Sequence, residues 1–159
     1  MSTILEALYR GDRTAAEEEA KGRDLDILEA AALGDAALVR ALLADDPTLV
    51  STRSQDGFTA LHYAAFFGTA EAASALLEHG ADPSAVAENE MQVQPLHSAA
   101  AVDANETARL LLDAGADPNA RQQGGFLPID AAVQNDNEEL RTLLLERGAE
   151  PADAARNQA

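Results

Sequence analysis

Clusters of apolar residues recur along the chain at a nearly constant interval, and each cluster has the length of a short helix. The best-formed cluster spans residues 61–68 and reads Leu-His-Tyr-Ala-Ala-Phe-Phe-Gly. A looser copy stands 34 residues earlier, another stands 35 residues later, and a further copy follows after 33 more. These copies lie at residues 27–34, 96–103 and 129–135. A period of this size is typical of proteins built from stacked repeats.

A second motif keeps the same step. Residues 76–83 read Leu-Leu-Glu-His-Gly-Ala-Asp-Pro, and the pattern returns at residues 111–118 and 144–151, with a weaker first copy at 42–46. Two independent motifs that share one spacing indicate a true internal repeat.

Each repeat predicts two short helices. The first carries a pair of Ala residues, whose small side chains allow neighbouring helices to approach closely. Gly34 or Gly68 then ends it, because glycine adopts the left-handed dihedrals of a helix C-cap. The second helix begins at an N-cap residue and ends in a Leu-Leu pair that we expect to face inward. The expected N-caps are Asp35, Thr69 and Asp136, and the expected helix stops are Gly80, Gly115 and Gly148.

A shortened repeat opens the chain, since residues 4–12 repeat the pattern of residues 27–35 only 23 residues upstream. Terminal repeats have no neighbour on one side and are expected to be atypical. We therefore predict a single, complete array over residues 1–159. Its expected parts are a truncated N-terminal capping repeat (1–22), three repeats (23–53, 54–88 and 89–121), a C-terminal capping repeat (122–151) and a fraying tail (152–159).

These residues resemble the ankyrin repeat family, whose pattern is roughly Asp-Gly-x-Thr-Pro-Leu-His-x-Ala-Ala, then Gly, Leu-Leu and Gly-Ala-Asp. Residues 56–65 match it almost throughout, and residues 95–100 and 128–132 are looser copies. The resemblance implies an all-α fold, an ankyrin-type solenoid of stacked helix-turn-helix repeats with short hairpin-like finger loops. It also implies that partners dock on the concave side, formed by the fingers and first helices, and that the protein has no chemistry of its own.

Several positions depart from the family pattern. The resemblance gives the His of the motif a structural role, which is hydrogen bonding of the turn. The departures are Met91-Gln92 in place of the Asp-Gly turn, Asp130 at the position of His62 and His97, and Leu25 and Leu127 in place of the capping Thr.

Composition excludes several kinds of chemistry. The chain has no Cys, which rules out disulfides, thiolate nucleophiles and Cys-ligated metals. It also has no HExxH, P-loop, GxSxG or GxGxxG motif. Paired acids such as Glu138-Glu139 are explained by the helix dipole. We therefore predict no enzymatic activity, no metal and no cofactor.

Charge narrows the range of partners. The formal net charge of −17 repels phosphate backbones and anionic lipid, so we expect neither direct nucleic-acid binding nor membrane binding. No apolar run approaches the ~20 residues that span a bilayer, and the first residues do not read as a secretory signal. We expect a cytoplasmic monomer. Ten Arg against one Lys, with abundant Ala, indicates a GC-rich coding sequence and a bacterial source.

The candidate binding residues follow from the resemblance, which places all four Phe of the chain in the groove or on the fingers. Aromatic side chains exposed within a polar rim are typical interface anchors, whereas core packing is the alternative for these Phe. Because the rim is acidic, we predict a protein partner with an apolar surface rimmed by basic residues. The predicted contact residues are Leu33, Arg53, Gln55, Asp56, Phe58, Phe66, Phe67, Glu88, Glu90, Met91, Val93, Val102, Gln123, Phe126 and Gln134.

Two other functions stay open. An acidic decoy would occupy the basic cleft of a nucleic-acid-binding protein, and its binding would collapse with added salt. An enzyme is the third possibility, although no converging acid–base set is visible in the sequence.

Overall fold

The structure is a computed structural model that describes residues 1–152. Within this range the chain forms ten α-helices and two 3₁₀ turns, and none of the helices is long and apolar enough to cross a membrane. The helices are α1 (Thr3–Tyr9), α2 (Arg13–Ala20), α3 (Ile27–Leu33), α4 (Ala36–Asp45), α5 (Ala60–Phe66), α6 (Ala70–Glu78), α7 (Pro95–Ala101), α8 (Asn105–Asp113), α9 (Pro128–Gln134) and α10 (Glu138–Glu146), with the turns η1 (Pro47–Ser51) and η2 (Gln123–Gly125).

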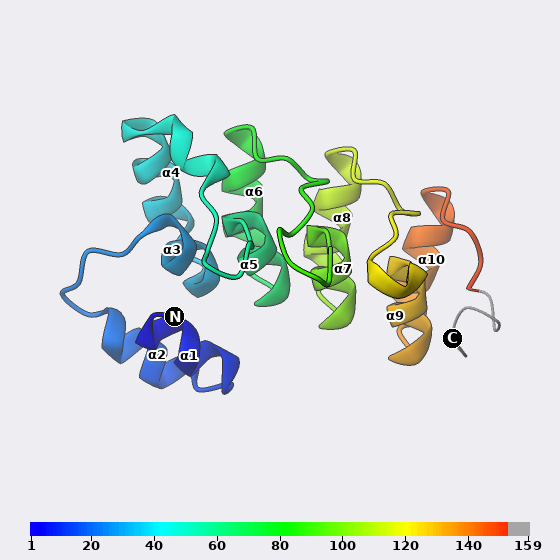
Figure 1. The fold of residues 1–159 in the computed structure, drawn as a ribbon, viewed down its shortest axis with the longest axis horizontal. Coiled ribbons are helices and arrows are strands. Elements are labelled where there is room, and N and C mark those ends of the chain that lie inside the picture. Colours follow the sequence, from blue (N-terminus) through cyan, green and yellow to red (C-terminus); the bar gives the residue numbers. More distant parts are fainter. Residues whose placement is uncertain (153–159) are drawn as a thin grey trace.

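The helices from α3 onward stack in two rows (Figure 1). The inner row is α3, α5, α7 and α9, and the outer row is α4, α6, α8 and α10. Each helix packs against the next helix of its own row and against its partner within the repeat. This arrangement confirms the predicted all-α solenoid.

The core runs continuously between the two rows. Leu61 and Leu96 hold the same position in successive inner helices and are at most 1% exposed, and Leu76 and Leu111 of the outer row are 0% exposed. Each buried Leu contributes roughly 1.5–3 kcal/mol relative to an exposed one. The predicted inward orientation of the Leu-Leu pair is wrong for its second member in the last repeat, since Leu145 is 38% exposed. Adjacent residues of a helix lie about 100° apart around its axis, so only one of the two points fully into the core.

The caps of the outer helices are confirmed in part. Asp35 accepts the Leu38 backbone N–H at 2.9 Å, as an N-cap should. Thr69 is the N-cap of α6, but its hydroxyl donates to the Ala31 carbonyl of the neighbouring repeat at 2.7 Å instead of capping its own helix. Asp136 is not an N-cap, because Asn137 holds that position and accepts the Leu140 N–H at 3.0 Å.

A residue with a left-handed backbone conformation follows each helix of the inner row. Gly34 and Gly68 have φ of 83° and 67°, and the equivalent Asp103 and Asp136 have φ of 57° and 54°. Because Asp136 takes this left-handed position, the N-cap of α10 lies one residue later than predicted, at Asn137.

The N-terminal pair, α1 and α2, does not continue the two rows. Figure 1 shows it below α3, with the end of α1 directed toward the lower end of α5. Helix α1 packs against α3, and the Arg13 guanidinium donates to the Leu33 carbonyl at 2.5 Å. This placement brings the end of α1 beside the second repeat, with consequences for the candidate site.

The finger loops are short hairpins. The Ser54 N–H donates to the Phe58 carbonyl at 2.8 Å, and the Ala87 N–H donates to the Val93 carbonyl at 2.8 Å. The Met91-Gln92 substitution preserves this geometry, because Gln92 takes the left-handed conformation (φ 51°) that Gly57 and Gly125 adopt at the same position. Of the predicted fraying tail, only Ala152 lies within the described residues.

Candidate partner-binding groove

Backbone hydrogen bonds join the three fingers (residues 54–58, 87–93 and 122–126) into one continuous surface, here called the ledge. The Glu88 N–H donates to the Gly57 carbonyl at 3.1 Å, and the Gln123 N–H donates to the Met91 carbonyl at 3.0 Å. A Cβ at Gly57 would lie 2.5 Å from the Glu88 carbonyl oxygen, so only glycine permits this approach. Main-chain contacts therefore help to set the spacing of the fingers.

Two buried histidines fix the fingers to the inner helices. Nδ1 of His62 accepts the Thr59 N–H at 3.2 Å, so Nε2 carries the proton and donates to the Val93 carbonyl of the next finger at 3.0 Å. His97 repeats this bridge between the Gln94 N–H and the Ala120 carbonyl, both at 3.0 Å. This is the structural role that the family resemblance implies.

Burial sets the charge of both rings. His62 is 2% exposed and His97 is 6% exposed. Burial lowers the pKa of His62 to about 4 and also lowers the pKa of His97. Both imidazoles are therefore neutral at pH 7, and they add no positive charge to the surface above them.

Asp130 replaces the histidine in the last repeat and accepts the corresponding backbone N–H at the start of its helix. Its carboxylate accepts the Leu127 N–H at 2.8 Å and so caps α9, where Leu127 itself offers no side-chain acceptor. Asp130 is 1% exposed.

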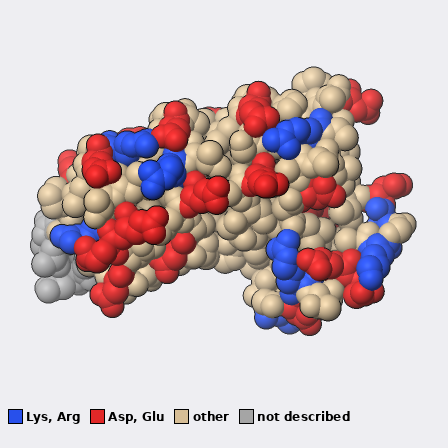
Figure 2. Space-filling model, turned by 180° about the vertical axis from the view of Figure 1, so that it is seen from behind, with Lys and Arg blue, Asp and Glu red and all other residues tan. Residues whose placement is uncertain are grey.

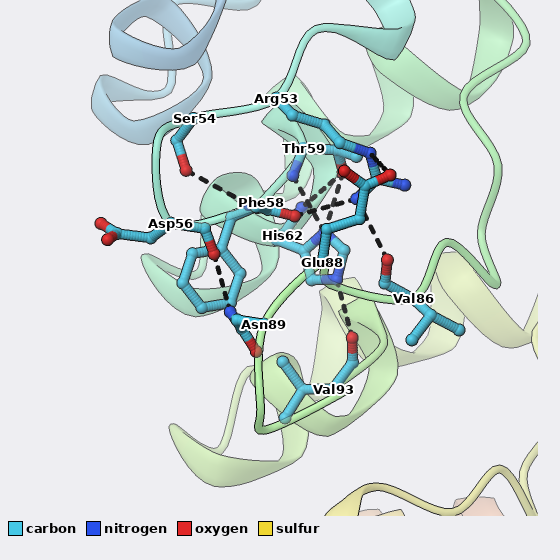
Figure 3. A network of polar contacts seen from close by, with 11 residues as sticks. Arg53, Ser54, Asp56, Phe58, Thr59, His62, Val86, Glu88, Asn89 and Val93 are labelled. Carbon is cyan, nitrogen blue, oxygen red and sulfur yellow. Dashed lines mark hydrogen bonds and ion pairs between the residues drawn. The ribbon is translucent and has the colours of Figure 1, made fainter.

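An ion pair between Arg53 and Glu88 connects two fingers (Figure 3). The Arg53 guanidinium donates to the carbonyls of Gly57 at 2.9 Å and Val86 at 3.0 Å, and its Nε pairs with the Glu88 carboxylate at 3.1 Å. Both were predicted as contact residues on the rim. In the structure Arg53 joins two fingers through these bonds, and the Glu88 side chain that pairs with it stays 70% exposed.

Five aromatic rings gather at the start of the groove. The ring centroid of Tyr9 lies 5.5 Å from that of Phe66 and 5.1 Å from that of Phe67. Tyr63 stacks with Phe67 at 6.4 Å, and Phe58 meets Tyr63 edge-on at 6.1 Å. Offset and edge-to-face pairs at such distances contribute about 0.5–1.5 kcal/mol each beyond the area that they bury.

Four of these rings, all except Phe67, border a hollow of about 360 Å³, here called the aromatic hollow. Most of its lining surface is apolar, and the lining includes the buried Tyr63. The lining residues are Tyr9, Phe58, His62, Tyr63, Phe66, Met91, Val93, His97, Ser98, Ala101 and Gln122.

A second hollow of about 310 Å³ continues the groove toward α9. It shares His97, Ala101 and Gln122 with the aromatic hollow, and adds Phe126 and Gln134. The two hollows form one path across the inner helices.

The structure brings six of the fifteen predicted contact residues together along the two hollows. Phe58, Phe66 and Met91 line the aromatic hollow, with Phe66 37% and Met91 54% exposed. Phe67 is half-buried behind Phe66, so its ring supports the surface more than it presents one. Other predicted residues lie exposed on the fingers or at the ends of inner helices: Gln55, Asp56, Glu90, Val102, Gln123 and Gln134.

Two predicted positions are placed differently. Leu33 borders a separate hollow with Glu17 and Lys21, because the N-terminal pair covers that part of α3. Val93 lines the aromatic hollow but offers it little surface, since it is 6% exposed and its carbonyl accepts from His62.

Tyr9 is a site residue that the sequence analysis missed. It holds the same register position in α1 as Phe66 in α5, but the irregular packing of the N-terminal pair is what brings the two rings into contact. Burial, followed by the influence of Tyr63 and the charge of Asp56, raises the pKa of Tyr9. Its hydroxyl therefore stays protonated over the physiological range of pH.

The remaining charge of the surface is acidic. Ion pairs occupy most basic side chains of the described range, among them Arg40 with Glu78 and Arg147 with Asp113. On the face opposite to that of Figure 1, basic side chains lie beside acidic ones (Figure 2). Within residues 1–152, neither Asp56 nor Glu90 belongs to an ion pair, and no group of three or more His, Asp or Glu could hold a metal ion.

Comparison with known proteins agrees with this architecture. Ankyrin repeats, as a set of three copies, match residues 27–122, which is more than half of the chain. The chain therefore belongs to the ankyrin repeat family, whose repeats are generally protein-interaction modules and typically lack catalytic activity.

One relative is an enzyme by name. The chain is similar to serine/threonine-protein kinase VIK of Arabidopsis thaliana, with 51% identity over 51 residues. The matched stretch is 32% of this chain and 12% of that kinase, so the chain spans a small part of the kinase's length.

Proposed function

We propose that this protein is a non-catalytic interaction module that binds a protein partner through its concave face of fingers and inner helices. The aromatic hollow carries this proposal. It is a concave surface between the fingers and the inner helices, and it is bordered by Phe66 and Met91, which are 37% and 54% exposed.

Exposure of these side chains is costly unless a partner covers them. Apolar side chains that gather around a concavity mark interaction sites, whereas single exposed apolar residues are common and carry no such meaning. Here the exposed rings are packed against one another and backed by Tyr63 and Phe67, so they are rigid before any partner arrives. A rigid apolar surface loses little side-chain entropy on binding.

The charge around the hollow supports a partner with basic residues around its apolar contact. The exposed acids Asp56 and Glu90 lie on the fingers that border the hollow. Arg53 offers little free positive charge there, since it is paired with Glu88. Complementary charge accelerates association and selects among partners.

The test compares substitutions at two residues whose side chains have almost the same exposed fraction. Phe66→Ser removes a ring from the hollow, and Leu145→Ser removes a side chain of almost the same exposure (38%) from α10. Partners captured from the native cells by each tagged variant are quantified by mass spectrometry, and each variant's unfolding midpoint is measured in parallel.

We expect a specific partner to be lost with Phe66→Ser and retained with Leu145→Ser. Equal recovery by both variants, with both folded, would place the binding surface elsewhere on the molecule.

A further inference from the structure

The aromatic hollow has the composition of a site for a cation. The faces of Tyr and Phe rings attract positive charge, and four such rings line it, from Tyr9, Phe58, Tyr63 and Phe66. Its lining contains no Lys or Arg, and the two histidines in it are neutral, because each accepts a backbone N–H at Nδ1.

A carboxylate stands on a finger that borders the hollow. Asp56 lies two residues before Phe58, whose ring lines the hollow, and the Asp56 side chain is exposed. Figure 3 shows the Asp56 side chain directed away from the Arg53–Glu88 ion pair. The backbone carbonyl of Asp56 accepts a hydrogen bond from the Asn89 side-chain amide at 2.8 Å. Among the described residues, no ion pair includes this carboxylate.

The volume of the hollow suits a single side chain. At about 360 Å³ it falls at the lower end of the range for small-ligand pockets, roughly 300–1,000 Å³. One long side chain fits within this volume, and the second hollow continues the groove beside it.

We propose that the hollow receives one arginine side chain from a basic segment of the protein partner, an inference that rests on the proposed function. The aliphatic stem would lie against Met91 and Val93, and the guanidinium would stack on the rings of Tyr9 and Phe66 within reach of Asp56. Arginine is favoured over lysine because its planar guanidinium stacks on aromatic faces and is more weakly hydrated than an ammonium. The mostly apolar lining penalises a strongly hydrated head group.

The test uses amino-acid amides that differ at the side-chain head. N-acetylarginine amide is titrated into the protein, and the neutral isostere N-acetylcitrulline amide, the apolar N-acetylnorleucine amide and N-acetyllysine amide are titrated separately. The chain has two Met, so the Met91 methyl signal in carbon-13 NMR reports on the hollow and the Met1 methyl signal serves as an internal control.

We expect saturable shifts of the Met91 methyl and the Phe66 ring with the arginine compound, and no saturable shift at Met1. Binding of the citrulline and norleucine compounds should be about tenfold weaker. Phe66→Leu and Asp56→Asn should each weaken arginine binding about threefold to tenfold. Leu145→Ser and Asp45→Asn, on α10 and α4 outside the groove, are the controls and should leave it unchanged.

Equal or tighter binding of norleucine or citrulline would overturn the cation site, and tighter binding of the lysine compound would overturn the choice of arginine. Neither result would affect the proposed function, which fails only if partner capture is independent of Phe66. The two proposals are therefore tested separately.

Discussion

The ring centroids of Tyr9 and Phe66 lie 5.5 Å apart, although a complete helix pair separates the two residues in the chain. Ala32 holds the same register position in the intervening helix α3 and is 0% exposed. An alanine there leaves room for the Tyr9 ring to reach α5. The N-terminal pair therefore does more than shield the end of the core, because it supplies one wall of the aromatic hollow.

Replacement of Tyr9 by Ala should loosen the N-terminal pair. The ring contacts both Phe66 and Phe67, and such contacts contribute about 0.5–1.5 kcal/mol each beyond burial. We expect the free energy of unfolding to fall by about 1–2 kcal/mol in urea, with faster amide hydrogen exchange in α1 and α2. Tyr9→Phe keeps the ring and should stay near the wild-type stability; an equal loss in both variants would mean that the hydroxyl, not the ring, carries the effect.

Stability should fall as the pH is lowered toward 4, owing to His62. Its pKa in the folded protein is about 4, below the ordinary value of 6.5, so the unfolded chain binds the proton more readily. The contribution is fully present above pH 6.5 and is lost progressively as the pH falls from 6.5 to about 4. At 1.36 kcal/mol per pKa unit, it amounts to about 3 kcal/mol.

His62→Gln should flatten this pH dependence. The exposed His79 provides the control, since its ring bonds only within its own helix, to the Ala75 carbonyl. Unfolding free energies are measured in urea at pH 7 and pH 4.5 for the wild type, His62→Gln and His79→Gln. Comparison of the differences removes the common effect of carboxylate titration. The pKa of His97 is also lowered, so part of the dependence should remain, but an undiminished dependence in His62→Gln would show that other groups are responsible.

Asp136→Gly should stabilise the protein. Asp136 has φ of 54°, which costs an L-residue roughly 1 kcal/mol relative to Gly, and within the described range its side chain makes no hydrogen bond. We expect a gain of roughly 0.5 kcal/mol after the entropy of glycine in the unfolded chain is included. Asp103→Gly relieves a similar φ but removes an acceptor for Asn135 and Asn137, so its gain should be smaller or absent. Thermal unfolding of the two variants distinguishes these cases.

Gly57→Ala should be far more damaging than Gly125→Ala. Both residues have φ near 80°, so the backbone strain is similar, but a Cβ at Gly57 would meet the Glu88 carbonyl at 2.5 Å. The atom nearest to a Cβ at Gly125 is a flexible Arg121 nitrogen at 3.9 Å. We expect Gly57→Ala to lose about 1–3 kcal/mol more than Gly125→Ala in urea unfolding. Similar losses would mean that the fingers separate without cost.

Salt distinguishes groove binding from an acidic decoy. A decoy that replaced 6–10 phosphate contacts would lose about 10³–10⁵ in affinity between 50 and 200 mM salt. Binding anchored in the aromatic hollow should lose about tenfold or less over the same range, because its apolar contacts are insensitive to screening. Calorimetric titration of the identified partner at the two salt concentrations provides the measurement.

Much of the fold could be predicted from local sequence signals. Gly34 ends α3 and Asp35 begins α4 as the pattern indicated, because a cap depends on residues within one helical turn. The exposure of Met91 on its finger was also accessible, since a large apolar residue stood where the family pattern has a turn residue. The one-residue error at Asp136 arose because its role depends on a left-handed backbone that Asp seldom adopts.

The sequence by itself determined the repeat, the helix pairs and the row of positions that face the concave side. These follow from periodicity, because every repeat buries the same face against its neighbour. Only the tertiary structure decided which of those positions form a site. The repeat period does not encode how the N-terminal pair packs. That packing brings Tyr9 against Phe66 and places Leu33 in a separate hollow, away from the groove. Contacts between fingers pair Arg53 with Glu88. Such contacts join residues of different repeats, and their geometry is set by how whole helix pairs pack together.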